Sequence, residues 1–376
     1  MRLTRYFIIP SIHPLLPMTA CFILGIAGQQ QWKIITYSHY GYVILAALLG
    51  AALFAKKIRY ILLSVTFLCA GVISHATYFH SYDSFHEHVS GKVQIRAVID
   101  SIEPIDHPWF NYQVMLCLHA VKQPSSPWQE KSGNIRMYVK EELGACTADL
   151  IECNISIKKP STDSFAQYLY KEGCVAFVCA PSLNCIILKH ASSSIPRFLS
   201  DVRHAILNKL KNVLSGRTFA VVSSIFLGNR MYVKKDMDRL KHNFKTWGIS
   251  HYLARSGLHV VLFVMLWHFL LSLLPLAFIL KQFLLIALVM LYALLSWSSI
   301  SFTRALLMFL LCKIPALFGY QTHYVHIITL ATLAILITNP LQLFFLDFQL
   351  SFGFTFALAW FGQLEAEKKR TLVLNT

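Results

Sequence analysis

The sequence predicts a polytopic α-helical membrane protein with an inserted small extracytoplasmic β-barrel (OB-like) domain. Three observations lead to this fold class. Hydrophobic residues make up 56% of the 376 residues and charged residues only 14%, compared with about a quarter in an ordinary soluble domain. Long apolar runs lie in both halves of the chain. Between them, a polar segment alternates with a period of two, which is typical of half-buried strands.

Apolar runs predict eight membrane-spanning helices, because a span needs about 20 apolar residues. Three lie in residues 1–83 and five in residues 249–376. The runs are Leu15–Gly28, Tyr42–Ala55, Ile58–Tyr78, Gly257–Leu274, Phe283–Trp297, Ser301–Phe318, Val325–Thr338 and Leu343–Gly362. The first, second and seventh are short and must include flanking residues. A signal peptide is the alternative for the first run, but prolines interrupt it, so we interpret it as a retained anchor.

Basic residues in short segments predict the orientation of these helices, because Lys and Arg are enriched on the cytoplasmic side. They precede the first span, fill the turn between the second and third, and follow the eighth. These residues are Arg2, Arg5, Lys56, Lys57, Arg59, Lys368, Lys369 and Arg370. We therefore expect both termini in the cytoplasm and residues 84–250 outside.

Residues 84–190, which we call the β domain, contain five or six short alternating runs separated by Gly, Pro and Ser. The runs are Val93–Ile99, Tyr112–Leu118, Ile135–Val139, Ile151–Ile157, Cys174–Val178 and Ile186–Leu188. Short strands at this spacing predict a small barrel or sandwich. An OB-type barrel is one candidate, and such barrels often bind oligonucleotides. A structural cap that binds nothing is the alternative.

Six of the nine cysteines lie in the β domain, and the extracytoplasmic side permits disulfides. They are Cys117, Cys146, Cys153, Cys174, Cys179 and Cys185. We expect one or two structural bridges, whose pairing the sequence does not fix; small buried thiols are the alternative. No CxxC pair is present, which argues against a zinc ribbon. We predict no metal and no cofactor.

Residues 191–248 form a basic segment, with eleven Lys or Arg against three Asp. Apolar residues recur at helical spacing in Pro196–Leu214, which predicts an amphipathic helix on the membrane surface. Contact with anionic lipid headgroups is one interpretation, and binding of the DNA backbone is the sharper one. The candidate DNA-binding residues are Arg197, Arg203, Arg230, Lys234, Lys235, Arg239, Lys241 and Lys245.

Polar residues near the outer ends of three predicted spans are candidate channel-lining or gate residues, since polar groups in a membrane are costly without a function or a partner. They are Ser256, Gly257, His259, Arg304, Asp347 and Gln349. An Arg304–Asp347 ion pair that only joins helices, or snorkelling of Arg304, is the structural alternative. Ser256, His259 and Asp347 also name the residue types of a catalytic triad. That signal is weak, no other catalytic motif is present, and we predict that the protein is not an enzyme.

Four sequence elements form a recognisable signature. The first is the central region, with Leu227–Arg230 and Gly248–His259, and the other three are SFTRALLMFLL (301–311), NPLQLFFLDFQLSF (339–352) and SFAQYLYKEGCVAFV (164–178). Together they resemble the signature of the ComEC family of competence proteins, in which Leu227–Arg230 is similar to a G-[DN]-R element and Gly248–His259 to a GxxHLLAxSGLH stretch. The resemblance covers most of the chain. Arg255 and Ala166 depart from the family's usual residues at these positions.

The resemblance implies an inner-membrane channel that takes up single-stranded DNA during natural transformation, with the barrel meeting DNA outside. It implies single-stranded DNA, membrane lipids, a DNA receptor, a cytoplasmic ATPase and self-association as partners. The HxHxDH motif of the family's metallo-β-lactamase-like nuclease is absent, and the bundle is shorter than usual in the family, so we expect it to be truncated. A small-molecule or lipid transporter with a structural extracytoplasmic cap is the alternative function.

Overall fold

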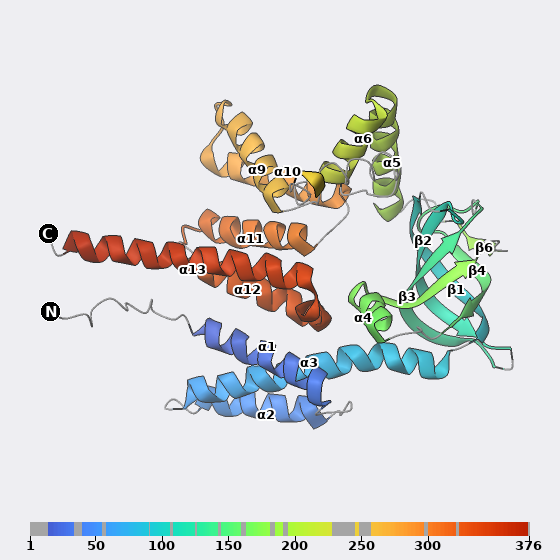
Figure 1. The fold of residues 1–376 in the computed structure, drawn as a ribbon, viewed down its shortest axis with the longest axis horizontal. Helices are drawn as coiled ribbons and strands as arrows, with labels where there is room; N and C mark the ends of the chain where they lie inside the picture. The colour runs from blue at the N-terminus through green and yellow to red at the C-terminus, as the bar shows by residue number, and fades with distance from the viewer. Residues whose placement is uncertain are drawn as a thin grey trace. The chain divides into compact units, whose positions relative to one another are not determined.

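A computed structural model describes most of the chain (Figure 1). The described residues are 14–33, 40–54, 58–89, 91–105, 108–124, 126–141, 144–158, 163–180, 185–190, 195–227, 245–247, 257–296, 300–320 and 323–374. They fall into two compact units, one formed by Met1–Ser81 with Arg304–Thr376 and the other by Tyr82–Thr303. Most of the described residues are helical, and within the described part of the second unit the strands form one mixed sheet of six.

Each of the eight predicted apolar runs forms a helix. The helices are α1 (Leu15–Trp32), α2 (Tyr40–Phe54), α3 (Arg59–His88), α9 (Gly257–Ser272), α10 (Phe278–Leu295), α11 (Ile300–Leu317), α12 (Tyr324–Thr338) and α13 (Leu346–Leu374). In the first unit, α12 contacts both α1 and α13. In the second unit, α9 packs against α10, with the rings of Phe263 and Tyr292 stacked at a centroid distance of 4.2 Å.

Three helices in the described ranges are long and apolar enough to cross a membrane: Arg59–His86, Phe278–Leu295 and Ile300–Leu317. Three shorter apolar helices accompany them, at Gly41–Ala52, Gly257–Ser272 and Tyr324–Thr338. These helices support the prediction of a membrane protein. The full set of eight spans and its orientation stay predictions.

The last predicted span begins later than the sequence suggested. Pro340–Phe344 forms a 3₁₀ turn, η2, and Phe345 is extended before α13 begins at Leu346. Proline fixes its own φ and has no N–H, which suits the first turn of a helix after a break. The break places Asp347 in the first turn of α13.

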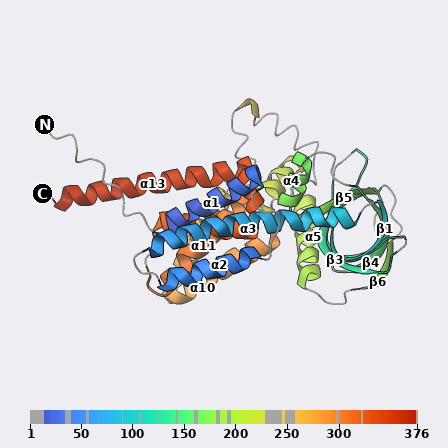
Figure 2. The ribbon, with the colours of Figure 1, turned by 90° about the horizontal axis from the view of Figure 1, so that it is seen from below.

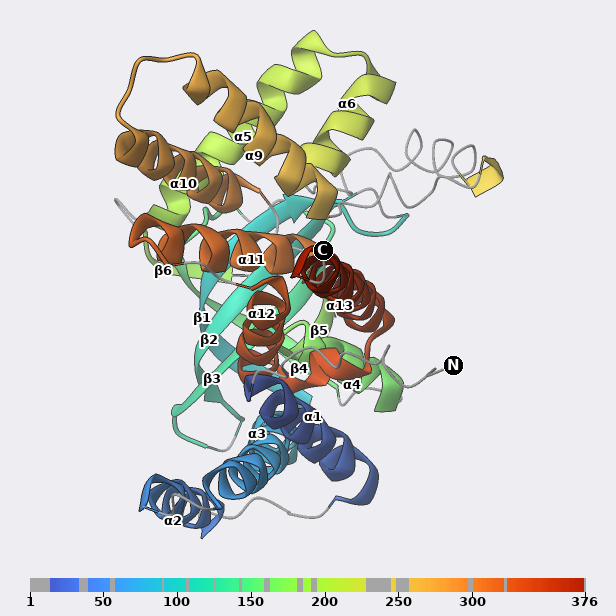
Figure 3. The ribbon, with the colours of Figure 1, turned by 90° about the vertical axis from the view of Figure 1, so that its left-hand side faces the viewer.

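α1 and α3 approach each other at two glycines, and Figure 3 shows the two helices side by side. A Cβ added to Gly25 of α1 would lie 2.2 Å from the carbonyl oxygen of Leu68. A Cβ added to Gly71 of α3 would lie 2.2 Å from the carbonyl oxygen of Phe22. Small residues allow helix backbones to come this close, which is a common basis of helix association in membranes.

The β domain contains the six predicted strands. They are β1 (Gly91–Pro104), β2 (Tyr112–Lys122), β3 (Gln129–Val139), β4 (Leu150–Ile157), β5 (Cys174–Ala180) and β6 (Cys185–Lys189). The order across the sheet is β5-β3-β2-β1-β4-β6. β3 and β5 are parallel, and the other neighbours are antiparallel. The predicted alternation is confirmed, because Val93, Ile95, Ala97 and Ile99 of β1 are all buried.

The predicted OB-like barrel is not supported, because the sheet is open. β5 and β6 are its edge strands, and the sheet curves until β5 approaches β4 (Figure 2). Closure there would need a free edge on β4. That strand is already paired with β1 on one side and with β6 on the other. Period-two alternation shows which side chains face inward, but it contains no information about which strand takes the last free edge.

The helix α4 (Asp163–Lys171) contacts β5, and its Leu169 and Tyr170 are almost fully buried. All nine cysteines are free thiols, so the expected bridges are not seen. Cys153 and Cys174 fit the alternative of small buried thiols. Burial raises the pKa of the Cys174 thiol, as it does for thiols in apolar surroundings.

Two further helical elements follow the sheet: α5 (Ile195–Val213), then α6 (Gly216–Val222), which continues into a π-helical turn, η1 (Ser223–Leu227). α5 forms the predicted amphipathic helix, and its place on the membrane surface stays a prediction. Its fully buried residue is Leu207, and α5 contacts α10. Phe198, one of the apolar residues of this helix, is 67% exposed.

Candidate functional site

Arg304 links α11 to α13 in the first unit. Its Nη1 donates hydrogen bonds to the carbonyl oxygen of Ser351 and, at 2.7 Å, to Oγ1 of Thr355. Thr355 in turn donates from Oγ1 to the same Ser351 carbonyl at 2.7 Å. The guanidinium carbon lies 5.6 Å from the ring centroid of Phe352. An arginine on an apolar helix is therefore held by an adjacent helix through its polar end, the arrangement expected for a charge within a membrane.

Asp347 and Gln349 lie at the start of α13. Asp347 is exposed in the first turn, where the helix dipole favours a negative charge. Gln349 donates from Nε2 to the carbonyl oxygen of Leu343 at 2.9 Å, which fixes the connection from η2 to α13. The two residues that receive hydrogen bonds from Arg304 lie one and two helical turns after Asp347.

Ser256, Gly257 and His259 belong to the second unit. Ser256 lies outside the described residues, whereas Gly257 begins α9 and is buried. His259 is also buried, with 9% of its surface exposed. Arg304 and Asp347 belong to the first unit, so a single polar layer built from both groups stays a prediction.

We expect Arg304 and Thr355 to be energetically coupled. The free energies of unfolding of Arg304→Leu, Thr355→Val and the double variant should give a coupling of about 0.5–1.5 kcal/mol, because each single change removes the same hydrogen bond. The measurement is reversible unfolding of the full chain in detergent. Thr332→Val is the matched control, because Thr332 Oγ1 donates a 2.8 Å hydrogen bond to the carbonyl oxygen of Ile328 within its own helix. Additive effects for Arg304 and Thr355 would contradict the contact.

Arg197, a predicted DNA-binding residue, lies beside a buried carboxylate in the second unit. Its Nη1 is 3.7 Å from Oδ1 of Asp149, whose side chain is 0% exposed. Oδ2 of Asp149 lies 3.1 Å from Nδ1 of His190 and accepts a 2.9 Å hydrogen bond from the backbone N–H of Cys146. The carboxylate thus joins the chain before β4, the residue after β6 and the first turn of α5.

Arg203 is directed toward α10 and β1. Its Nη2 donates a hydrogen bond to the carbonyl oxygen of Leu294, at the end of α10. Burial lowers the pKa of the Arg203 guanidinium, while Glu103 and Asp100 of β1 act in the opposite direction. The charge is retained, because the ordinary pKa of Arg is so high. Arg197 therefore contacts Asp149 from the first turn of α5, and Arg203 contacts α10 from a position six residues later.

The other predicted DNA-binding residues are not gathered into one described surface. Lys245 is exposed in the short helical turn at 245–247. The remaining candidates lie outside the described residues. They are Arg230, Lys234, Lys235, Arg239 and Lys241.

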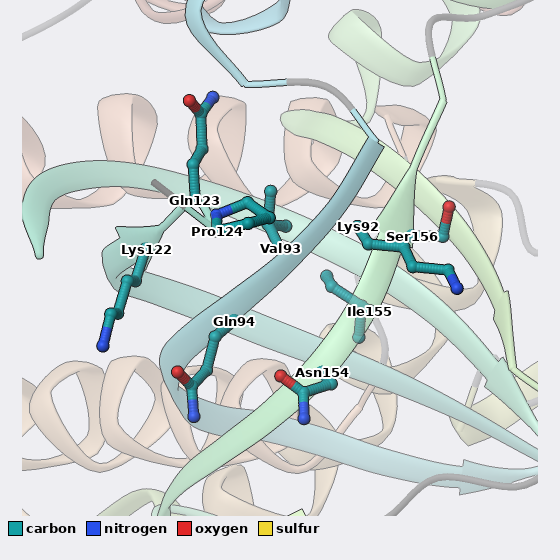
Figure 4. A pocket seen from close by; sticks show the side chains of 9 residues that line it. All are labelled: Lys92, Val93, Gln94, Lys122, Gln123, Pro124, Asn154, Ile155 and Ser156. Atoms are coloured by element: carbon teal, nitrogen blue, oxygen red, sulfur yellow. The ribbon is translucent and has the colours of Figure 1, made fainter. Parts of the chain in front are cut away.

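A polar hollow of about 700 Å³ lies on the β domain at β1, β2 and β4 (Figure 4). Its polar lining residues are Lys92, Gln94, Lys122, Gln123, Asn154 and Ser156. Val93, Pro124 and Ile155 supply its apolar part. This hollow was not predicted from the sequence, although the residues between the buried positions of β1 include two basic side chains and an amide, those of Lys92, Arg96 and Gln94.

No group of three or more His, Cys, Asp or Glu side chains suited to a metal ion is found in the ranges that the structure describes. Of the three histidines near the end of α3, His86 is buried against Phe85, with ring centroids 5.6 Å apart, and Tyr170, with ring centroids 6.5 Å apart. Its surroundings are those of a packed core side chain.

Comparison with known proteins agrees with the sequence signature. The family model for competence proteins matches residues 225–374, which include α9 to α13 and the Arg304 contacts. ComE operon protein 3 of Bacillus subtilis (strain 168) is 23% identical over 286 residues, covering 75% of this chain and 36% of the relative. The chain therefore spans about a third of the length of that relative. No solved structure matches the chain. The predicted resemblance is confirmed over residues 225–374, which match the family of competence proteins, and ComE operon protein 3 is a relative of the chain.

Proposed function

We propose that this protein is an inner-membrane channel protein for the uptake of single-stranded DNA during natural transformation. The observation that carries the proposal is the match of residues 225–374 to the competence-protein family. The relative in Bacillus subtilis, named for the ComE operon, supports the same assignment. Natural competence is the uptake of external DNA, so a competence protein with apolar helices fits a membrane step of that process.

The proposed arrangement has both termini in the cytoplasm and residues 84–250 outside. The β domain and the basic segment at 191–248 would then meet DNA before it reaches the helices. A DNA receptor, a cytoplasmic ATPase, membrane lipids and a second copy of the chain are the proposed partners. The proposed role is transport, without catalysis and without a cofactor.

Arg304 is the proposed fixed charge of the entrance. A cation held among apolar helices attracts phosphate more strongly than one in water, because the low dielectric constant strengthens the interaction. Its hydrogen bonds to Ser351 and Thr355 hold the guanidinium in one place. Ser256, Gly257, His259, Asp347 and Gln349 complete the proposed entrance.

Binding of labelled single-stranded DNA to the full chain in detergent, measured by fluorescence anisotropy across a salt series, tests the proposal. The logarithm of the binding constant should fall linearly with the logarithm of salt concentration, because phosphate binding releases counterions. Changing Arg230, Lys234, Lys235 and Arg239 to Gln should reduce the slope by about 0.7 for each phosphate contact removed. Gln at Lys368, Lys369 and Arg370 is the control.

Absence of binding at low salt would contradict the proposal and favour the small-molecule or lipid transporter with a structural cap. Passage through the membrane needs a second measurement. Labelled DNA added outside proteoliposomes should become protected from external nuclease when the protein is present. Binding without protection would contradict the channel and leave a DNA-binding membrane protein.

A further inference from the structure

We propose that His75 of α3 is a proton-binding site, and that protonation of its ring releases the turn η2 from α3. The site takes a proton as its ligand and does not depend on the binding of DNA. His75 and η2 both belong to the first unit. In the proposed orientation, both lie toward the outer side of the membrane.

The imidazole of His75 is buried without a hydrogen-bond partner. Only 4% of the residue is exposed, and neither Nδ1 nor Nε2 has a hydrogen-bond partner among the described residues. Buried polar groups are nearly always hydrogen-bonded, because the loss of water around them is otherwise not compensated. An ionisable residue inside an apolar helix also indicates a function when no partner stabilises it.

Aromatic rings hold His75 at the break between α12 and α13. Its ring stacks on Phe79 of α3, with centroids 6.1 Å apart, and meets the ring of Phe344 in η2 edge-on at 5.9 Å. The turn η2 in turn contacts both α12 and α13. It also contains a second buried acceptor, because Oε1 of Gln342 has no hydrogen-bond partner among the described residues. Water that entered when η2 moved would satisfy the ring of His75.

The elements packed against α3 offer no charge to balance a protonated His75. They are η2, α1, which approaches Gly71, and α2, whose Gly41 lies against Ile73. None of the three contains Asp, Glu, Lys, Arg or His, and their titratable side chains are Cys21, Tyr40 and Tyr42. On α3 itself, the nearest acidic or basic residue along the chain is the exposed His80. Burying a charge without a partner is costly, so the ring of His75 is neutral while η2 covers it.

A proton therefore favours the released state. Once water reaches the ring, His75 can bind a proton in the ordinary range of histidine, between pH 5 and 8. The released state then binds one proton more than the packed state. By linkage, the equilibrium constant for release rises by up to about tenfold for each unit by which the pH falls below about 6.5. A falling pH opens the contact between α3 and η2, and a rising pH closes it.

The turn that is released sets the beginning of α13. The backbone N–H of Phe345 donates to the carbonyl oxygen of Gln342 at 3.1 Å. The N–H groups of Phe348 and Gln349 both donate to the carbonyl oxygen of Phe345, also at 3.1 Å. A proton on His75 would therefore loosen the first turn of α13, which carries Asp347.

Hydrogen exchange of the full chain in detergent between pH 5 and 8 tests the site. The amides of Phe345, Phe348 and Gln349 report release, after correction for the intrinsic pH dependence of exchange. Their protection should fall by up to about tenfold per pH unit below about 6.5. In His75→Phe, which keeps an aromatic ring but cannot bind a proton, protection should not change with pH. The matched control is His80→Phe, an exposed position on the same helix, in which the pH dependence should remain.

A second variant tests the site even if His75→Phe does not fold. Phe344→Leu keeps His75 and removes its ring contact with η2, so protection should be lower at every pH and retain its dependence on pH. Protection that does not change with pH in the original protein overturns the site. So does a pH dependence that persists in His75→Phe or disappears in Phe344→Leu. An equal pH-dependent loss in the middle of α12 would show opening of the whole unit and would also overturn the site.

Discussion

Replacing Gly71 with alanine is expected to force α1 away from α3 and to lower the free energy of unfolding by about 1–3 kcal/mol. The new Cβ would lie 2.2 Å from the carbonyl oxygen of Phe22, and a backbone atom cannot rotate away as the end of a side chain can. Gly25→Ala should have a similar effect, because its Cβ would meet the carbonyl oxygen of Leu68 at the same distance. Unfolding of the full chain in detergent measures both changes.

Gly50→Ala is the matched control for this prediction. It also lies within an apolar helix, α2, but a Cβ there has no atom within 4 Å. Alanine favours the helix over glycine by about 1 kcal/mol, so this variant should unfold at the same temperature as the original protein or higher. Equal behaviour of Gly50→Ala and Gly71→Ala would show that α1 and α3 do not make this contact.

The second large effect is expected for Asp149→Ala in the β domain. The change removes the partner of His190 and Arg197 and leaves the N–H of Cys146 without its acceptor. A lost hydrogen bond to a buried charged group costs about 1.5–3 kcal/mol, and we expect a loss of this size in the free energy of unfolding.

Hydrogen exchange locates the effect of this substitution. Amides in the first turns of α5 and in β6 should exchange faster in Asp149→Ala, because the carboxylate contacts the residues that begin and end these elements. Asp201→Ala on α5 is the control, since it removes an exposed carboxylate from the same region. A uniform change across the β domain, or equal effects of the two substitutions, would argue against a local role for Asp149.

The periodicity of apolar residues predicted the helices and strands, because the pattern within each segment is enough to show which of its faces is buried. Val93 to Ile99 alternate, and the strand that they predict is β1. Closure of the sheet was not predictable in this way. It depends on β6, whose short pairing with β4 occupies the edge that a barrel needs. The sequence of β4 does not show which of two distant strands will take that edge.

The charge of a residue is easier to predict from the sequence than the partners that its side chain contacts. Arg304 was predicted as an intramembrane cation, but its partners Ser351 and Thr355 lie on a helix about 50 residues later and carry no signal of their own. Arg197 and Arg203 were predicted to bind DNA because they lie in a basic segment. Their contacts with Asp149 and Leu294 depend on how α5 packs, which composition does not specify.

The helix α5 is held by side-chain contacts at two points, one to the β domain and one to α10. Arg197 connects its first turn to the buried Asp149, and Arg203 connects it to the last turn of α10, about 9 Å further along the helix axis. A helix fixed in this way cannot absorb a displacement by bending as a loop does. A displacement of the sheet would therefore be transmitted through α5 to the apolar helix α10.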